Sequence, residues 1–181
     1  MHTSIPLRFC YMLAIIRMYT YVRLVAIDMI VSFCGHADYL ESNEDEIRLL
    51  EVLEKLIQDN QVEFFLGGYG GFDAFAYRCA KKYQQLHSSA RLVFVTPYFD
   101  EWFQNKIDTL CKQYDQIVYP ELEKVPKKFA ILKRNEWMVE RCDCLICYVN
   151  RHFGGAYKTL LYAYKHKKTY ENLYQGDFCI E

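Results

Sequence analysis

The sequence predicts an α/β protein built on a doubly wound, mostly parallel sheet with helices on both of its faces. Two observations carry this prediction. From residue 29 onward, short apolar runs alternate with segments in which apolar residues recur at helical spacing. The connections between them are short, and parallel neighbouring strands need crossovers, which are usually helices. Ligands of such sheets bind outside the carboxyl ends of the strands, so function is expected in the loops that follow the strands.

The first half of the chain supplies three strands and two helices. Strands are expected for three short apolar runs, MIVSFCG at 29–35, VEFFLGG at 62–68 and RLVFVTP at 91–97. A helix is expected at 42–60, because apolar residues recur at helical spacing behind Ser42, a favoured N-cap residue type. The next helix, at 72–86, begins directly after a run of glycines.

The second half continues the alternation. A helix is expected at 102–114, a short strand at QIVYP, 116–120, and a helix at 126–142, whose opening proline suits a first helical turn. CLICYVN at 144–150 is the fifth strand, a helix follows at 154–166, and KTYENL at 168–173 is the last strand.

The length and composition fit one domain. A chain of 181 residues, 52% apolar and 25% charged, can bury a substantial core, and we place the domain at residues 29–181. Residues 1–28 form an uncertain leader, because Met29 directly precedes the first strand and is a candidate for the true start. Three arginines interrupt the leader, so it lacks the ~18–20 uncharged residues of a membrane-spanning helix. We therefore expect a cytoplasmic protein with no membrane partner.

The charge distribution bears on partners. The net charge is −1, and the 22 Lys and Arg residues are spread along the chain rather than blocked. Such a distribution does not predict the extended basic surface that binds a long stretch of nucleic acid, so nucleic acid is not expected as a partner. A small anionic ligand is compatible with this charge. The sequence leaves homo-oligomer formation open.

Eight cysteines are too few for a disulfide scaffold in a chain with this much apolar material. The tightest group, CDCLIC, falls on a predicted strand, where Cys144 and Cys147 should face opposite ways. We therefore expect reduced, mostly buried thiols and no metal site. A cofactor is likewise not expected.

Four glycines, Gly67, Gly68, Gly70 and Gly71, stand between the second strand and its helix. Backbone N–H groups there would point into a cleft at the positive end of the helix dipole, which favours a phosphate. The run is neither a G-x-G-x-x-G fingerprint nor a Walker loop. The alternative is a tight turn with close helix-to-sheet packing. Asp73, in the first helical turn, either stabilises the helix terminus or receives a ribose hydroxyl or a base nitrogen.

GGAYKT places Gly154 and Gly155 at a second helix N-terminus, with Lys158 and Thr159 inside the first turns. Two anion-ready helix ends on one sheet rim suit a ligand with a phosphate and another polar part. Lys158 is alternatively a solvated helix lysine. Further candidates for ligand contact follow other strands: Gly35, His36, Pro97, Tyr98 and Asn150.

Two arginines of the helix at 126–142 lie on a helical face of their own. At 100° per residue, Arg134 and Arg141 form a stripe of their own within otherwise apolar surroundings. Such an arginine needs a partner. It is either part of an internal ion pair, a snorkelling side chain, or a guanidinium that binds a phosphate.

Five segments, in order, resemble the YpsA-like branch of the SLOG superfamily, relatives of the Lonely Guy and DprA proteins. The segments are VSFCGHADY, FFLGGYGGFDAFA, VTPYFDEW, YPELEKVPKKFAILKRNEWMVERCDCLICYVN and GGAYKTLLYA. The resemblance implies a Rossmann-like sheet with a nucleotide-related ligand at its carboxyl rim. In the Lonely Guy enzymes an arginine followed by a lysine, with a methionine three positions later, serves the active site. The matching residues here are Arg134, Asn135 and Met138.

One departure from the Lonely Guy pattern bears on catalysis. Their glycine- and threonine-rich loop ends in glutamates, one of them catalytic, whereas the corresponding stretch here, 154–161, contains no acid. Glycosidic cleavage passes through a cationic sugar that a carboxylate stabilises, and a lysine there opposes that charge.

We therefore expect binding of a nucleotide or nucleotide-derived small molecule, by a sensor or sequestering module, rather than catalysis. One alternative is a phosphoribohydrolase acting on nucleoside monophosphates, with Asp73 or Asp38 as its acid. Another is DprA-like binding of single-stranded DNA, which calls for a basic stacking groove. The 16 tyrosines supply stacking material, but the near-neutral charge argues against it.

Overall fold

Six parallel strands form one sheet in a computed structural model that describes residues 27–180. The predicted leader, 1–28, lies outside this range except for its last two residues. The spatial order is β4-β3-β2-β1-β5-β6, and every neighbouring pair is parallel. The strands are β1 (Met29–Gly35), β2 (Val62–Leu66), β3 (Ala90–Val95), β4 (Gln116–Val118), β5 (Cys144–Tyr148) and β6 (Thr169–Asn172). The predicted α/β fold class is confirmed.

Helices connect the consecutive strands, as parallel pairing requires. They are α2 (Asn43–Ile57), α3 (Gly71–Leu86), α4 (Glu101–Gln113), α5 (Lys127–Arg141) and α6 (Gly154–Lys165). Ser42 caps α2 as predicted, because its side chain accepts a hydrogen bond from the N–H of Asp45 at 3.1 Å.

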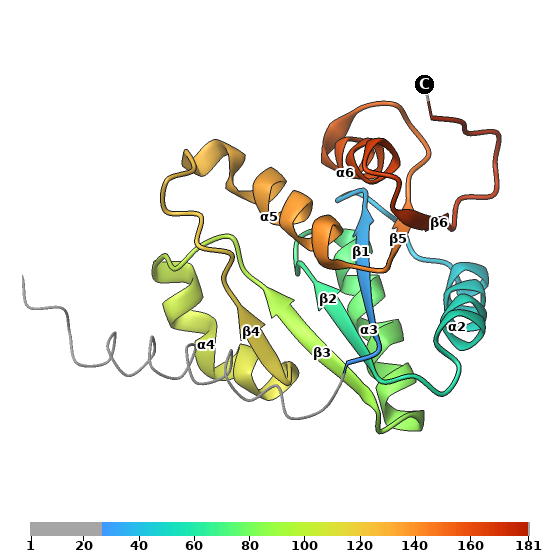
Figure 1. Ribbon diagram of the computed structural model, residues 1–181. Coiled ribbons are helices and arrows are strands. Elements are labelled where there is room, and N and C mark those ends of the chain that lie inside the picture. The colour runs from blue at the N-terminus through green and yellow to red at the C-terminus, as the bar shows by residue number, and fades with distance from the viewer. Residues whose placement is uncertain (1–26, 181) are drawn as a thin grey trace, which may run out of the picture.

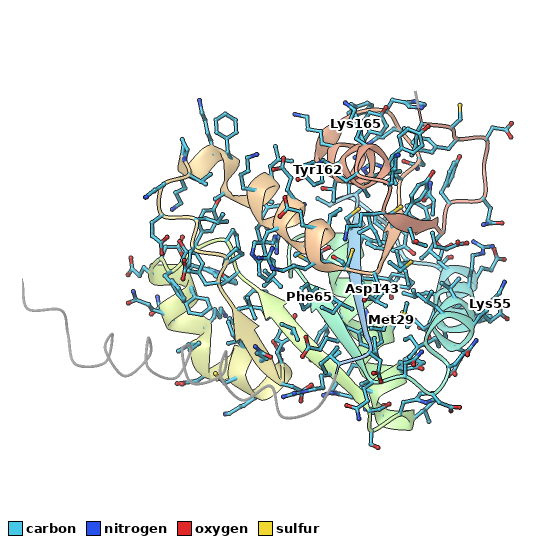
Figure 2. The ribbon with its side chains drawn as sticks, viewed as in Figure 1. Met29, Lys55, Phe65, Asp143, Tyr162 and Lys165 are labelled. Carbon is cyan, nitrogen blue, oxygen red and sulfur yellow. The ribbon has the colours of Figure 1, made fainter. Side chains whose placement is uncertain are left out.

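The helices cover both faces of the sheet, and the side chains of β3 show how they divide. Leu92 belongs to the core formed with α2 and α3, and Phe94, two residues on, packs on Phe103 of α4. Val93 faces the other way, toward α5. On that same face Phe65, labelled in Figure 2, stacks on a tryptophan of α5 with ring centroids 5.7 Å apart. Figure 1 accordingly shows α3 behind the strands and α5 in front of them.

The direction of chain progression reverses next to β1, which lies between β2 and β5. Asp143, labelled beside Met29 in Figure 2, joins the start of β5 to β1. Its carboxylate accepts a hydrogen bond from the N–H of Ile30 at 2.7 Å. A reversal of this kind opens a crevice at the carboxyl ends of the two strands. This crevice lies between the loops that follow β1 and β5.

Cys144 and Cys147 lie in different core clusters, on opposite faces of the sheet, as predicted. The seven cysteines within residues 27–180 are all free thiols, and five of them are buried. None of the helices within these residues is long and apolar enough to cross a membrane.

Candidate functional site

A cavity of about 220 Å³ lies at this reversal, where the loops after β1, β2 and β5 meet α5 and the start of α6. We call it the switch-point pocket. Eight of the residues proposed from the sequence line it: Gly35, His36, Gly67, Asp73, Arg134, Asn135, Gly154 and Gly155. The pocket therefore draws on four separate segments of the chain, as a doubly wound sheet is expected to arrange them.

Two further cavities adjoin it. The aromatic pocket, about 320 Å³, lies at the end of β3 and includes Gly68, Pro97 and Tyr98 among its lining residues. The outer pocket, about 240 Å³, includes Asp38 and Asn150. The remaining sequence candidates line none of these three pockets: Gly70, Gly71, Lys158 and Thr159.

The first half of the glycine run is shaped by close packing. A Cβ atom on Gly67 would overlap Nη1 of Arg134 and lie 2.7 Å from a carboxylate oxygen of Asp73. A Cβ on Gly68, whose φ is +66°, would lie 2.6 Å from the ring of Phe94. Only glycine fits either position without a shift of its neighbours.

The second half of the run joins α3 to the loop after β1. The N–H of Gly71 donates to the carbonyl of Ala37 at 2.7 Å, and the N–H of Phe72 donates to the carbonyl of His36 at 3.4 Å. Gly70, with φ +93°, passes so close to Ala37 that a Cβ would lie 2.6 Å from its Cα. Two of the first N–H groups of α3 thus donate to carbonyl oxygens of the protein itself. This agrees with the alternative interpretation of these glycines, a tight turn with close packing.

The N-terminus of α6 is arranged differently. Gly154 (φ +91°) and Gly155 face open space, since a Cβ on either would meet no atom of the described residues within 4 Å. Within residues 27–180 no side chain caps this helix, and its first turn holds no acidic residue. The helix end therefore offers free N–H groups and a positive dipole to the switch-point pocket, a combination that binds anions.

Thr159 and Asn135 hold this helix end in place. The Thr159 hydroxyl donates to the carbonyl of Gly155 at 3.0 Å and accepts from the Asn135 side-chain amide at 3.1 Å. Thr159 is buried, and Lys158 next to it is exposed. The structure thus places Thr159 behind the helix terminus, linking α6 to α5.

Arg134 is the largest side chain among those fully buried in the described part of the chain. Its Nη1 donates to the carbonyl oxygens of Gly67 at 2.7 Å and Val95 at 2.8 Å, so it joins the ends of β2 and β3. Its Nε is buried and has no partner among residues 27–180. Burial lowers the pKa of Arg134, and the nearby Asp73 carboxylate opposes that shift.

Asp73 is the acidic residue among those that line the switch-point pocket in the described structure. Its carboxylate accepts from the N–H of Tyr69 at 2.8 Å. Burial raises the pKa of Asp73, while the Arg134 guanidinium and the Tyr69 N–H pull it back down. Asp73 is therefore a carboxyl in a largely dry setting, beside a cation.

Asp38, the other candidate acid, pairs with Arg151 across the crevice. Two hydrogen bonds of 2.9 and 2.7 Å join the carboxylate to the guanidinium. This bidentate contact lowers the pKa of Asp38. The Nε of Arg151 is buried and unpartnered within the described residues, and Arg151 lines both the switch-point and the outer pocket.

His36 is buried between these pockets. Its Nε2 lies 3.3 Å from the backbone N–H of Asn150 and accepts from it, which requires a neutral ring with the proton on Nδ1. Burial, followed by the charge of Arg151, lowers the pKa of His36, and Asp38 opposes the shift.

Sequence reasoning missed Tyr69, Arg151, Ile131 and Trp102, all of which line a pocket. Arg151 had a usable signal, because it follows a predicted strand directly. Tyr69 stands between the two glycine pairs, and its exposed ring could not be foreseen from spacing. Within residues 27–180 no group of three His, Cys, Asp or Glu side chains could hold a metal ion.

Comparison with known proteins places the fold among familiar ones. No family model matches the chain. The chain is similar to the uncharacterized SPbeta prophage-derived protein YoqJ of Bacillus subtilis (strain 168), at 26% identity, in a match that covers 68% of this chain and 80% of that protein.

Two solved structures of DNA processing protein A (DprA) share the fold. The Streptococcus pneumoniae protein matches with a TM-score of 0.54 at 15% identity, and the match covers 78% of this chain and 49% of the DprA chain. The Helicobacter pylori protein matches with a TM-score of 0.57 at 17% identity, and the match covers 82% of this chain and 66% of that DprA chain. The chain thus spans less than two thirds of either DprA. The resemblance seen in the sequence holds at the level of the Rossmann-like fold.

The expectation that nucleic acid is not a partner is wrong. The Helicobacter pylori DprA structure is described for its single-stranded DNA binding mode, so this fold serves nucleic-acid binding in a neighbour. The expectation relied on the net charge of the whole chain and on the spread of its Lys and Arg residues along the sequence. Binding depends instead on local charge, and two guanidinium groups, those of Arg134 and Arg151, lie at one pocket despite the net charge of −1.

Proposed function

We propose that this protein binds the phosphate of a nucleotide or nucleotide-derived molecule in the switch-point pocket, as a sensor or sequestering module of the YpsA-like branch. The observation that carries the proposal is the convergence of three donors. Arg134 and Arg151 each hold a buried Nε without a partner among the described residues, and the free N-terminus of α6 lies at the same pocket. An anion would satisfy donors that are otherwise costly to bury.

Binding suits this geometry better than glycosidic cleavage. A hydrolase needs a carboxylate beside the cationic sugar of the transition state. Asp38 is held by both of its oxygens against Arg151, and Asp73 already accepts the Tyr69 N–H. We therefore place Asp73 beside the ligand as a support of the loop before α3, rather than as a catalytic acid.

The experiment isolates the charge at the start of α6. Gly155→Asp and Gly155→Asn are nearly isosteric and differ by one negative charge. Titration calorimetry with inorganic phosphate and adenosine 5′-monophosphate should give binding to the wild type and to the Asn variant. Affinity should fall at least about tenfold in the Asp variant, because a carboxylate would occupy the anion position. Thermal shift should follow the same order, since a ligand of the native state raises Tm.

Two results would contradict the proposal. One is the absence of any Tm shift with mono-, di- or cyclic nucleotides and ADP-ribose at concentrations well above millimolar. The other is binding that is equally strong in the Asp and Asn variants, which would place the anion away from α6.

Binding of single-stranded DNA is a second candidate, favoured by the exposed aromatic side chains near the carboxyl edge of the sheet. Tyr69, Trp102 and Phe153 are between 55% and 67% exposed. Aromatic platforms of this kind stack successive bases, and the Helicobacter pylori DprA provides the precedent within the fold. Anisotropy of a labelled oligothymidylate should then show binding that falls steeply with salt. Binding that does not change with salt, or none at low salt, would exclude this candidate.

A further inference from the structure

We propose that the aromatic pocket is a nucleobase site, in which the base stacks while the phosphate of the same nucleotide occupies the switch-point pocket. This inference rests on the proposed function and extends it. It assigns a ligand class to the cavity of about 320 Å³ at the end of β3, which phosphate binding alone leaves unused.

The lining of the aromatic pocket selects a flat, apolar ring. Six of its residues are aromatic or aliphatic: Tyr69, Phe94, Pro97, Tyr98, Ile131 and Trp102. Tyr69 is 62% exposed and Trp102 is 55% exposed, so both rings have faces free to stack. The volume lies within the range of small-molecule sites, which are mostly apolar with a few polar groups.

Tyr98, one wall of the pocket, is already held in place by the protein, which favours binding because this side chain needs no ordering on contact. The Tyr98 hydroxyl donates to the carbonyl of Lys127 at 3.0 Å, and the Lys127 ammonium lies 5.3 Å from the Tyr98 ring centroid. The Tyr98 N–H also donates to the Thr96 hydroxyl at 3.3 Å. These contacts fix the ring from two elements, the loop after β3 and the start of α5.

The aromatic and switch-point pockets adjoin, because both are lined by Gly67, Tyr69, Ile131 and Arg134. A ligand that fills both must join an anion to a flat ring through a short polar linker, and a nucleotide has this construction. Asp100, the carboxylate at the aromatic pocket, caps α4 by accepting from the N–H of Phe103 at 3.3 Å and pairs with Lys127 at 3.3 Å. The negative charge of Asp100 is therefore partly neutralised, which suits a pocket for an uncharged base.

The test compares ligands with and without a base on matched variants. Adenosine 5′-monophosphate and ribose 5-phosphate are titrated against the wild type, Trp102→Ala and Phe129→Ala. Phe129 is the control because it is a similarly exposed aromatic that lines neither pocket. We expect Trp102→Ala to weaken adenosine 5′-monophosphate by roughly 5- to 150-fold, the range of base stacking, and to leave ribose 5-phosphate unchanged. Phe129→Ala should change neither.

A spectroscopic readout tests the same contact without removing the side chain. The chain has two tryptophans, Trp102 and Trp137, so a Trp137→Phe background reports Trp102 alone. Its emission should change on addition of adenosine 5′-monophosphate and not of ribose 5-phosphate. Repeating the titration with oligothymidylate identifies the source of the base: a free nucleotide, or a base within single-stranded DNA. Binding of either with loss in Trp102→Ala supports the inference.

The outcomes separate this inference from the proposed function. If ribose 5-phosphate binds as tightly as adenosine 5′-monophosphate, and oligothymidylate is unaffected by Trp102→Ala, the base site is refuted and phosphate binding stands. If neither phosphate-bearing ligand nor oligothymidylate binds, the proposed function fails and the base site fails with it.

Discussion

Arg134 on α5 and Gly67 at the end of β2 are joined by a hydrogen bond of 2.7 Å from Nη1 to the carbonyl oxygen, across 67 residues of sequence. The same Nη1 also reaches Val95 at the end of β3. The carbonyl ends of two neighbouring strands thus share one cation. Nη1 of Arg134 therefore holds the two strand ends together, and its Nε has no partner among residues 27–180.

Arg134→Ala should lower the free energy of unfolding by about 3–5 kcal/mol, because it strands two buried carbonyls and leaves Asp73 without its cation. Urea denaturation measures this change. Arg141→Ala is the matched control: it lies two turns later on α5, half exposed over the ring of Trp137 at 4.0 Å, and should cost less than about 1 kcal/mol. Equal stability of the two variants, with phosphate affinity lost only at Arg134, would make Arg134 a ligand contact and not a part of the scaffold.

Gly67→Ala should destabilise the fold by about 1–3 kcal/mol, since its methyl group would overlap Nη1 of Arg134 and push it from the strand ends. Gly155→Ala is the counterpart, because its added methyl would have no atom of the described structure within 4 Å, and it should be neutral or stabilising in the helix. Thermal denaturation of the two variants tests this. An unchanged Tm in Gly67→Ala would mean that α5 can move away from β2 without a loss of stability.

Asp38→Asn should tighten phosphate binding, about two- to fivefold, because it removes the carboxylate that competes for Arg151 at the pocket. Calorimetry with inorganic phosphate at low salt measures the effect. Asp108→Asn on the exposed side of α4 makes the same change in net charge and should leave affinity unaltered. Weaker binding in Asp38→Asn would show that Asp38 holds Arg151 in its binding position.

His36 should make stability depend on pH. Its pKa in the folded protein lies below its ordinary value of 6.5, so between these two values the unfolded chain binds more protons. Stability is therefore full above pH 6.5 and falls as pH drops through this window, with a slope of up to about 1.4 kcal/mol per pH unit. Protonation also removes the acceptor for the Asn150 N–H.

Urea titrations between about pH 8 and about pH 5, on the wild type and His36→Gln, measure this dependence. The glutamine can still accept the Asn150 N–H but does not titrate. The two curves should separate as the pH falls, with the wild type losing more stability. Parallel curves would mean that His36 titrates alike in the folded and unfolded states.

The sequence sufficed for the fold because its signals are local. Ser42, Pro126 and the apolar runs mark the ends of elements within a few residues, and helices of this length between short strands impose parallel pairing. The carboxyl rim followed from topology, and eight proposed residues meet there in one pocket.

The roles of individual residues depended on contacts that the sequence does not encode locally. The two glycine runs look alike in sequence, yet one faces the side chains of Arg134 and Phe94 and the other faces open space. Arg151 pairs with Asp38 only because β1 and β5 are neighbours, 113 residues apart at this contact. Helical spacing placed Arg134 and Arg141 on one stripe, yet the structure buries Arg134 and leaves Arg141 half exposed. Which of the two is buried, and the two carbonyl partners of Arg134, required the fold.

The contrast between the two glycine runs separates selection for folding from selection for binding. In a library of single variants, a screen for folded protein should treat Gly67 as a core position and reject most side chains, while accepting many at Gly155. A screen for ligand retention should reject acidic and bulky side chains at Gly155 as well. A position that is permissive in the first screen and restrictive in the second identifies a residue kept for its ligand, and Gly155 is where this difference should be largest.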